Sequence, residues 1–327
     1  HGVPRHDFST NTNACGPCPE ALSWVQAADV THYPDPGYAH LRQRLAEFHQ
    51  VEPQRIVIMG SASEAMVRLS VATRRLGLQR VWFPEQHYGD VERLAQAVGL
   101  EAVSHHESAQ LLWCCEPSTP EGRSQEGLLE LVRTQSTSQV VVLDCAYEPL
   151  RLSGTCSLSG AERPHVWQLW SPNKALGMTG VRAAYLIAPH SALDPSDFAA
   201  RLGSLMQWLA PSWPVGAQGV AMLEAWCLPS VQRWLVNSRQ SLVRWKQQQL
   251  ALCERLGWAT KASDTNYHLA QPLESDAPGI AVWRQAHGIK LRDASSFGLA
   301  GWVRMGVLSP GSQQQLLRAV TQWRERK

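Results

Sequence analysis

Short apolar runs that alternate with helical patterns constrain the fold more than any other feature of this sequence. Three runs of four or five residues are almost wholly apolar: Ile56–Met59, Leu111–Cys115 and Val140–Asp144. Segments with helical spacing follow the first two runs, over residues 65–76 and 127–133. Continuous apolar runs of this length are typical of strands buried on both faces. The alternation continues to about residue 190 and predicts an α/β fold with a mostly parallel central sheet.

The pattern changes in the last third of the chain. Residues 192–226 have helical spacing and several tryptophans, which indicates that they belong to the hydrophobic core or to an interface. Residues 230–256 form one long amphipathic pattern, and a helix of this kind often leads into a second domain. Short strands and helices are mixed after it. We expect an N-terminal arm over residues 1–30 that joins the small domain, a large domain over residues 31–228 and a small α+β domain over residues 229–327.

Composition excludes several classes of partner. The formal net charge is +2, which is too near neutral to indicate nucleic acid or a membrane surface. No apolar run reaches the roughly 18 residues that a spanning helix needs. Eight cysteines are scattered along the chain, which favours free thiols in the cytoplasm. Cys15 and Cys18 form a CxxC pattern, but no second one completes a zinc site, so we expect no metal.

Lys174 lies in the segment that most strongly indicates chemistry. Residues 171–182, SPNKALGMTGVR, form a polar turn between two short apolar runs that we interpret as strands. A lysine can form a Schiff base with an aldehyde, and the guanidinium of Arg182 can bind a phosphate. The pair suits pyridoxal phosphate, although a bare lysine and arginine in a loop are more often solvated charges.

Two other segments could belong to the same site. Residues 60–64, GSASE, follow a predicted strand and precede a predicted helix, where backbone N–H groups can bind a phosphate. An ordinary connection between strand and helix would look the same. Asp144 ends an apolar strand, which costs free energy unless the charge is needed there. A strand-end aspartate that faces water is equally common.

The order and spacing of these segments resemble the fold-type I pyridoxal-phosphate enzymes. The nearest group comprises histidinol-phosphate aminotransferase and threonine-phosphate decarboxylase. Residues 11–17, NTNACGP, resemble that group's N-x-N-P-x-G-P arm, and residues 33–36 match its Y-P-D-P. Residues 291–293, LRD, and 303–306, VRMG, match its two substrate-arginine motifs. The resemblance covers nearly the whole chain and implies a class I/II aminotransferase of PLP-dependent transferase-like fold, with helices on both faces of the sheet.

The resemblance also implies a role for each matching residue. Lys174 would hold pyridoxal 5′-phosphate as a Schiff base and move the proton at the substrate α-carbon. Asp144 would pair with the pyridine nitrogen, and Tyr147 would bond the phenolic oxygen. The remaining cofactor contacts are expected from Ser61, Ala62, Ser63, Tyr88, Thr119, Ser171 and Arg182, with Tyr33 contributed by a neighbouring subunit. Substrate contacts are expected from Arg304, Arg292 and Asn13.

Three positions depart from the family pattern. Thr119 stands where an asparagine normally bonds the phenolic oxygen, and a threonine hydroxyl is shorter and offers one donor. Asn173 replaces a serine before the lysine. Cys145 replaces a glutamate beside the strand-end aspartate, and the sequence offers no physical reason for it.

The resemblance implies a homodimeric aminotransferase. It would transfer an amino group between an amino acid or amino phosphate ester and a 2-oxo acid, with glutamate and 2-oxoglutarate as the partner pair. One alternative is a threonine-phosphate decarboxylase-like enzyme of cobalamin biosynthesis, because His1-Gly2 and Asp7-Phe8-Ser9 resemble the arm of that enzyme. A remote alternative is a non-catalytic relative that acts as a binding module.

Overall fold

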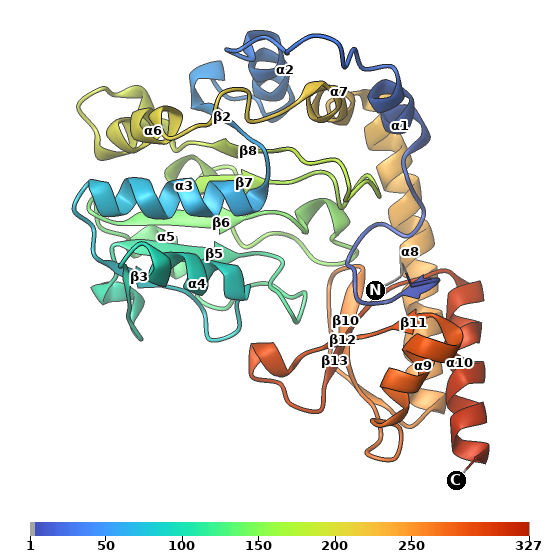
Figure 1. The fold of residues 1–327 in the computed structure, drawn as a ribbon. Helices are drawn as coiled ribbons and strands as arrows, with labels where there is room; N and C mark the ends of the chain where they lie inside the picture. Colours follow the sequence, from blue (N-terminus) through green and yellow to red (C-terminus); the bar gives the residue numbers. More distant parts are fainter. Residues whose placement is uncertain (1–3, 327) are drawn as a thin grey trace.

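The computed structural model describes residues 4–326 and is built around a seven-stranded sheet (Figure 1). One strand, β8, runs antiparallel to both of its neighbours, and the other pairs are parallel. The predicted mostly parallel sheet is confirmed. In spatial order the strands are β2 (Ile56–Met59), β8 (Ala184–Ile187), β7 (Trp167–Trp170), β6 (Val140–Asp144), β5 (Leu111–Cys115), β3 (Arg80–Trp82) and β4 (Glu101–Ala102).

Alternate residues of these strands enter two separate cores, one on each face of the sheet. In β5, Leu111 and Trp113 belong to one core, whereas Leu112 and Cys114 belong to the other. The helices that cover the first face are α3 (Ala62–Arg75), α4 (Gly89–Ala97) and α6 (Phe198–Trp208). Those that cover the second are α1 (Pro19–Gln26), α2 (Ala39–His49), α5 (Leu128–Thr134) and α7 (Ala217–Trp226).

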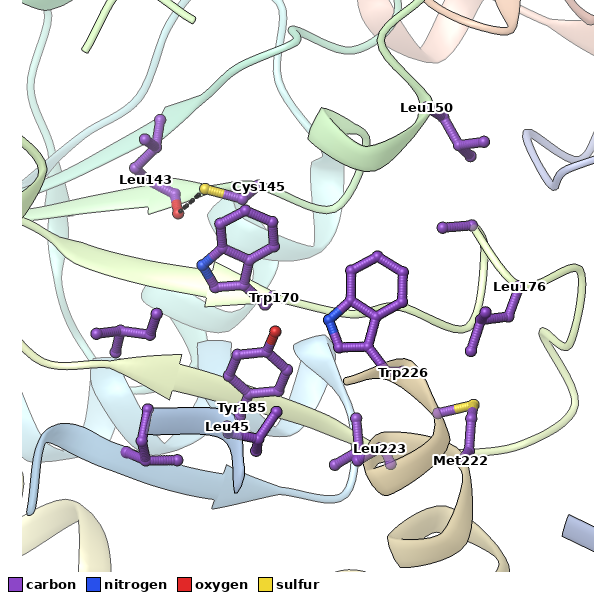
Figure 2. Packing of buried hydrophobic residues seen from close by; sticks show 14 of the residues in the cluster. Leu45, Leu143, Cys145, Leu150, Trp170, Leu176, Tyr185, Met222, Leu223 and Trp226 are labelled. Carbon is purple, nitrogen blue, oxygen red and sulfur yellow. Dashed lines mark hydrogen bonds between the residues drawn. The ribbon is translucent and has the colours of Figure 1, made fainter. Parts of the chain in front are cut away.

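The surroundings of Cys145 in the second core explain why an apolar group suits this position. Figure 2 shows its side chain beside the indole of Trp170, among leucines and two further aromatic rings. The thiol is buried and donates to the carbonyl of Leu143 at 3.6 Å. Burial raises the pKa of the Cys145 thiol, so the residue behaves as a small apolar core group.

The last third of the chain forms a smaller sheet. Its four strands are β12 (Arg292–Asp293), β13 (Val303–Gly306), β10 (Tyr267–Gln271) and β9 (Ala259–Thr260). The helices beside it are α8 (Pro229–Arg255), α9 (Gly279–His287) and α10 (Pro310–Glu325). Figure 1 shows α8 running from the large sheet to the small one.

The N-terminal arm joins the smaller sheet region. β1 (His6–Asp7) pairs in parallel with β11 (Ile289–Lys290), and the arm then runs back toward α1 (Figure 1). Residues 1–3, including His1 and Gly2, lie outside the described residues. The division into residues 1–30, 31–228 and 229–327 fits this arrangement and stays a prediction.

Some details differ from the sequence expectation. Within residues 192–226, where helical spacing was expected, the chain forms α6 and α7 and turns between them at Trp213, where φ is +48°. Helix α3 begins three residues before the expected Ala65, because the Ser61 hydroxyl accepts from the Glu64 amide at 3.0 Å and caps it. No helix within residues 4–326 combines the length and apolar character that crossing a membrane requires.

Two histidines with lowered pKa values should make the fold sensitive to acid. The pKa of His49 is lowered to about 4, first by burial and second by the charge of Arg163. The imidazole bonds the Tyr185 hydroxyl at 2.7 Å. His268 is likewise buried with a pKa of about 4. Because these values lie below the unfolded value of 6.5, stability is fully present above pH 6.5 and is lost as the pH falls toward 4.

We therefore expect His49 to contribute roughly 3 kcal/mol of this pH dependence. Urea unfolding of the wild type and of His49→Phe at several pH values between 7 and 4 measures it. The free energy of unfolding should change less steeply with pH in His49→Phe than in the wild type. His105→Phe, which changes an exposed histidine, should keep the pH dependence of the wild type. Equal slopes in all three proteins would contradict the assignment.

Candidate active site

The ends of three strands lie at one edge of the large sheet. Both β2 and β7 run antiparallel to β8, with Met59 opposite Ala184 and Trp170 opposite Tyr185, and β6 runs parallel to β7. The end of each of these three strands therefore lies near the start of β8. The predicted site residues that follow these ends or precede β8 are Ser61, Ala62, Ser63, Asp144, Tyr147, Ser171, Lys174 and Arg182.

Lys174 lies at the centre of this group. Its Nζ is 3.4 Å from the Ser171 hydroxyl and 5.4 Å from the centroid of the Tyr147 ring. The backbone around it is held by the arm, since the Asn13 amide donates to the Lys174 carbonyl at 2.9 Å. Gly177 makes this contact possible, because its φ is +70° and a Cβ there would lie 3.1 Å from the backbone of Gly16.

Asp144 faces Lys174 from the end of β6. Burial raises the pKa of its carboxyl, and the charge of Lys174 acts against that rise. One carboxylate oxygen accepts from the Ala146 amide at 2.9 Å. Asp144, Tyr88 and Ser118 line one small cavity of about 50 Å³. The other carboxylate oxygen of Asp144 has no recorded bond to residues 4–326 and can meet a cationic partner.

Tyr88 also lines this cavity. It is partly exposed and its hydroxyl donates to Asp90 at 2.8 Å. Burial raises the pKa of Tyr88 to about 12, and the bond to Asp90 adds to the rise. The hydroxyl is therefore neutral at pH 7, and the ring is the part of Tyr88 that can contact a flat ligand.

The start of α3 has the features of a phosphate site. The Ser61 hydroxyl caps the helix, and Glu64 accepts from the Gly60 amide at 2.7 Å. The amides of Ala62 and Ser63 have no recorded acceptor among the residues that the structure describes. Free N–H groups at a helix start attract anions. Arg182 is exposed nearby, which leaves its guanidinium available.

Arg304 links the two sheets. It lies on β13, and its guanidinium is 5.7 Å from the ring centroids of both Tyr267 and Phe297. One terminal nitrogen donates to the Thr119 hydroxyl at 3.0 Å, and the other donates to the Ser9 carbonyl at 3.3 Å. The Nε atom is buried and has no partner within residues 4–326. A buried donor of this kind is expected to bind a ligand.

Arg292 lies directly opposite Arg304 in the register of β12 and β13. Its guanidinium is 5.5 Å from the centroid of the Phe297 ring and donates to Ser296 at 2.9 Å. The structure therefore brings the two predicted substrate arginines together around one ring.

The arm gives a result that the sequence did not predict. Both N–H groups of the Asn13 side chain are used, because they donate to the Ala175 carbonyl and the Ser238 hydroxyl at 2.9 Å each, and its oxygen accepts from the Cys15 amide at 3.0 Å. Its role as a substrate contact stays a prediction. Asn11 is also buried, yet neither atom of its amide has a partner among the described residues. The N-x-N pattern carried no signal that separates the two.

Tyr267 is a second residue that sequence reasoning missed. It is fully buried, its ring lies 4.9 Å from that of Tyr147, and its hydroxyl donates to the Ser118 carbonyl at 2.7 Å. It therefore connects the Lys174 group with Arg304. In the sequence it appeared only as part of a short strand.

One predicted residue lies apart from this group. Tyr33 is 76% exposed and stacks on Trp213, with ring centroids 4.2 Å apart. No contact between Tyr33 and the Lys174 group is recorded within residues 4–326.

Comparison with known proteins identifies the family. Residues 6–322 match the family model described as aminotransferase class I and II. The chain belongs to the class I and II aminotransferases. Histidinol-phosphate aminotransferase from Symbiobacterium thermophilum is 26% identical over 341 residues, which span 96% of this chain and 90% of the relative. The Haloferax volcanii enzyme of the same name is 25% identical over 336 residues, 96% of this chain and 87% of the relative.

Solved structures have the same fold. Histidinol-phosphate aminotransferase from Sinorhizobium meliloti, in complex with pyridoxal-5′-phosphate, superposes with a TM-score of 0.82 and 18% identity, covering 99% of this chain and 92% of that one. L-threonine-O-3-phosphate decarboxylase from Porphyromonas gingivalis superposes with a TM-score of 0.79 and 19% identity, covering 98% of this chain and 99% of that one. These likenesses confirm the predicted PLP-dependent transferase-like fold.

Pyridoxal 5′-phosphate is the cofactor of this aminotransferase, and the residues present fit it. Lys174 would form the Schiff base, Asp144 would face the pyridine nitrogen, and the start of α3 would bind the phosphate. Among the departures, Thr119 retains a hydroxyl proton while its oxygen accepts from Arg304. Asn173 donates to the Val181 carbonyl at 3.3 Å and holds the turn, so it has a structural role there.

Removal of the Lys174 amine should prevent covalent attachment of the cofactor. Lys174→Ala should show no cofactor adduct after borohydride reduction, and turnover should fall by about a hundredfold to ten-thousandfold because the proton at the α-carbon loses its carrier. Mass spectrometry and steady-state kinetics measure the two effects. Lys290→Ala, on β11, is the control and should retain the adduct. An adduct in Lys174→Ala would contradict the assignment.

Replacement of Asn11 should raise the stability of the fold and weaken substrate binding. Asn11→Leu removes a buried amide without a partner, so the free energy of unfolding should rise by about 1–3 kcal/mol, while KM for the amine substrate should rise about tenfold. The control, Asn13→Leu, breaks three bonds and should lower stability by about 1–3 kcal/mol. An Asn11→Leu variant with unchanged KM would show that the amide does not contact the substrate.

Proposed function

We propose that this aminotransferase acts on an amine that carries an anionic group, either an amino acid or the phosphate ester of an amino alcohol. Glutamate and 2-oxoglutarate are the proposed partner pair. The observation that carries the proposal is Arg304, whose buried Nε lacks a partner while its other nitrogens are held in place. A guanidinium fixed in this way is preorganised for a carboxylate or phosphate oxygen.

The residues of the chain would divide the work of the reaction. Bound pyridoxal 5′-phosphate supplies an electron sink for the electron pair left at the substrate α-carbon. The Lys174 amine would take the proton from that carbon and return it elsewhere. The Asp144 carboxylate would hold a proton on the pyridine nitrogen, and the Tyr147 hydroxyl would bond the phenolic oxygen. Arg304 and Asn11 would orient the substrate.

A second candidate reaction is decarboxylation of an amino acid that carries a phosphate. The opposed placement of Arg292 and Arg304 on β12 and β13 supports it, because two guanidinium groups can bind a carboxylate and a phosphate of one substrate. The decarboxylase from Porphyromonas gingivalis shares the fold. Fold alone does not decide between reactions.

One experiment separates the two reactions. The enzyme is incubated with histidinol phosphate, threonine phosphate or glutamate, and the cofactor spectrum and released CO2 are followed. We expect conversion to the pyridoxamine form without CO2, and its reversal by 2-oxoglutarate. Release of CO2 with no lasting change in the cofactor spectrum would show that the enzyme is a decarboxylase and not an aminotransferase. If no compound changes the spectrum and none releases CO2, both proposals fail.

We also propose that the enzyme is a cytoplasmic homodimer whose sites lie at the subunit boundary. Tyr33 and Trp213 form an exposed aromatic pair, and Trp208 nearby along the chain is 88% exposed. An exposed aromatic surface of this kind favours association. Tyr33 would then reach the phosphate of the partner's cofactor.

A mixture of two inactive variants tests the shared site. When Tyr33→Ala and Lys174→Ala chains are refolded together, each mixed dimer contains one site with both original residues. Activity should exceed the sum of the two parents, and sedimentation should give a dimer. A monomer that retains full activity at low concentration would refute the proposal.

A further inference from the structure

Lys246 is a buried charged residue outside the site described above. It lies on α8 and its side chain is 9% exposed. Its Nζ donates to the carbonyl of Ser263 at 2.5 Å and to that of Thr265 at 2.8 Å. The ammonium group therefore holds the backbone on both sides of Asp264. We call residues 261–266 the anchor loop.

The anchor loop contacts a segment of the large sheet region that we call the strap, residues 118–122. The Asp264 amide donates to the Gly122 carbonyl at 2.7 Å, and Lys261 pairs with Glu121 at 3.0 Å. Tyr267, which follows the loop, bonds the Ser118 carbonyl. The strap is thus fixed at three points by the smaller sheet region.

The contact between the loop and the strap leaves no spare room. Gly122 has a φ of +74°, and a Cβ there would lie 2.4 Å from the Thr265 hydroxyl and 2.5 Å from that of Ser263. Real Cβ atoms do not approach so closely, so a movement of the loop displaces the strap. The other side of the loop is braced as well, since the Asp264 carbonyl accepts from the Leu152 amide at 2.5 Å.

The strap carries Thr119, whose hydroxyl holds a terminal nitrogen of Arg304. A continuous set of contacts therefore runs from Lys246 through the loop and strap to Arg304. We propose that Lys246 is a positioning residue for substrate binding, because its ammonium group fixes the loop that sets the place of Thr119 and Arg304. The inference rests on the proposed function, in which Arg304 binds the anionic group of the substrate.

The charge state of Lys246 supports this role and supplies a test. Burial lowers the pKa of Lys246 to about 8, and the charge of Asp264 acts in the opposite direction. The other titratable group that faces it is His268, which is neutral at pH 7 because burial lowers its pKa to about 4. The ammonium form below pH 8 makes charge-assisted bonds, which are stronger than those of a neutral amine.

Kinetics of three variants test the proposal, with glutamate, histidinol phosphate and threonine phosphate as substrates. Lys246→Met should raise KM about tenfold, as expected for lost bonds from a charged group. The kcat value and the spectrum of the bound cofactor should change little, because Asp144 ends β6 and Lys174 lies in the turn between β7 and β8, outside the loop and the strap. Lys246→Arg should keep KM low. Lys290→Met, the matched control, should behave as the wild type.

The pH dependence gives an independent measurement on the wild type. Its KM should rise above pH 8 as Lys246 loses its proton, whereas Lys246→Arg should show no such rise, because arginine stays charged. Gly122→Ala, which strains the same contact from the strap side, should raise KM in the same way and covers the case in which Lys246→Met does not fold.

An unchanged KM in Lys246→Met, or equal pH profiles of the wild type and Lys246→Arg, would overturn the proposal. A loss of stability with no change in KM would leave Lys246 a purely structural residue. If the wild type turns over none of the three amines, it is the proposed function that fails. Glutamate affinity, measured through tryptophan fluorescence in the same variants, then tests Lys246 by itself.

Discussion

A carboxylate at the end of a buried strand is the constraint on which this active site depends. β6 is the middle strand of seven, and Asp144 at its end is only partly exposed. Burial disfavours its charged form, and the charge of Lys174 offsets part of that cost. The protonated pyridine nitrogen of bound pyridoxal 5′-phosphate would offset more of the cost of burying the Asp144 charge. The turn that carries Lys174 and the arm that supports it are therefore arranged around one unfavourable charge.

The strands that face two cores were the most predictable part of the fold. Ile56–Met59, Leu111–Cys115 and Val140–Asp144 coincide with β2, β5 and β6, because burial on both faces leaves a continuous apolar run that is a local signal. β1, β4 and β11 have two residues each and exist only through pairing with distant segments. The break at Trp213 depends on one left-handed residue, which no period of apolar residues records.

The candidate site divides in the same way. Lys174 and Asp144 could be singled out because a polar turn and a strand end mark them in the sequence, whereas Tyr147 was named only through the family resemblance. Asn11 and Asn13 differ only in what surrounds them after folding, since α8 supplies Ser238 to one and nothing to the other. Tyr267 acts through contacts with residues more than a hundred positions away. Such roles come from tertiary packing and have no local signal.

The proposed roles would place reaction chemistry and substrate recognition in different parts of the fold. Asp144 ends β6 of the large sheet and Lys174 lies in the turn between β7 and β8, whereas Arg292 and Arg304 belong to the small sheet. The Thr119–Arg304 bond and the Tyr147–Tyr267 contact join them. Each sheet also has its own core, since the apolar residues of β6 and those of β13 pack in separate clusters. Unpaired atoms such as Arg304 Nε cost stability in the free enzyme, and the surrounding cores must compensate for that cost until the substrate binds.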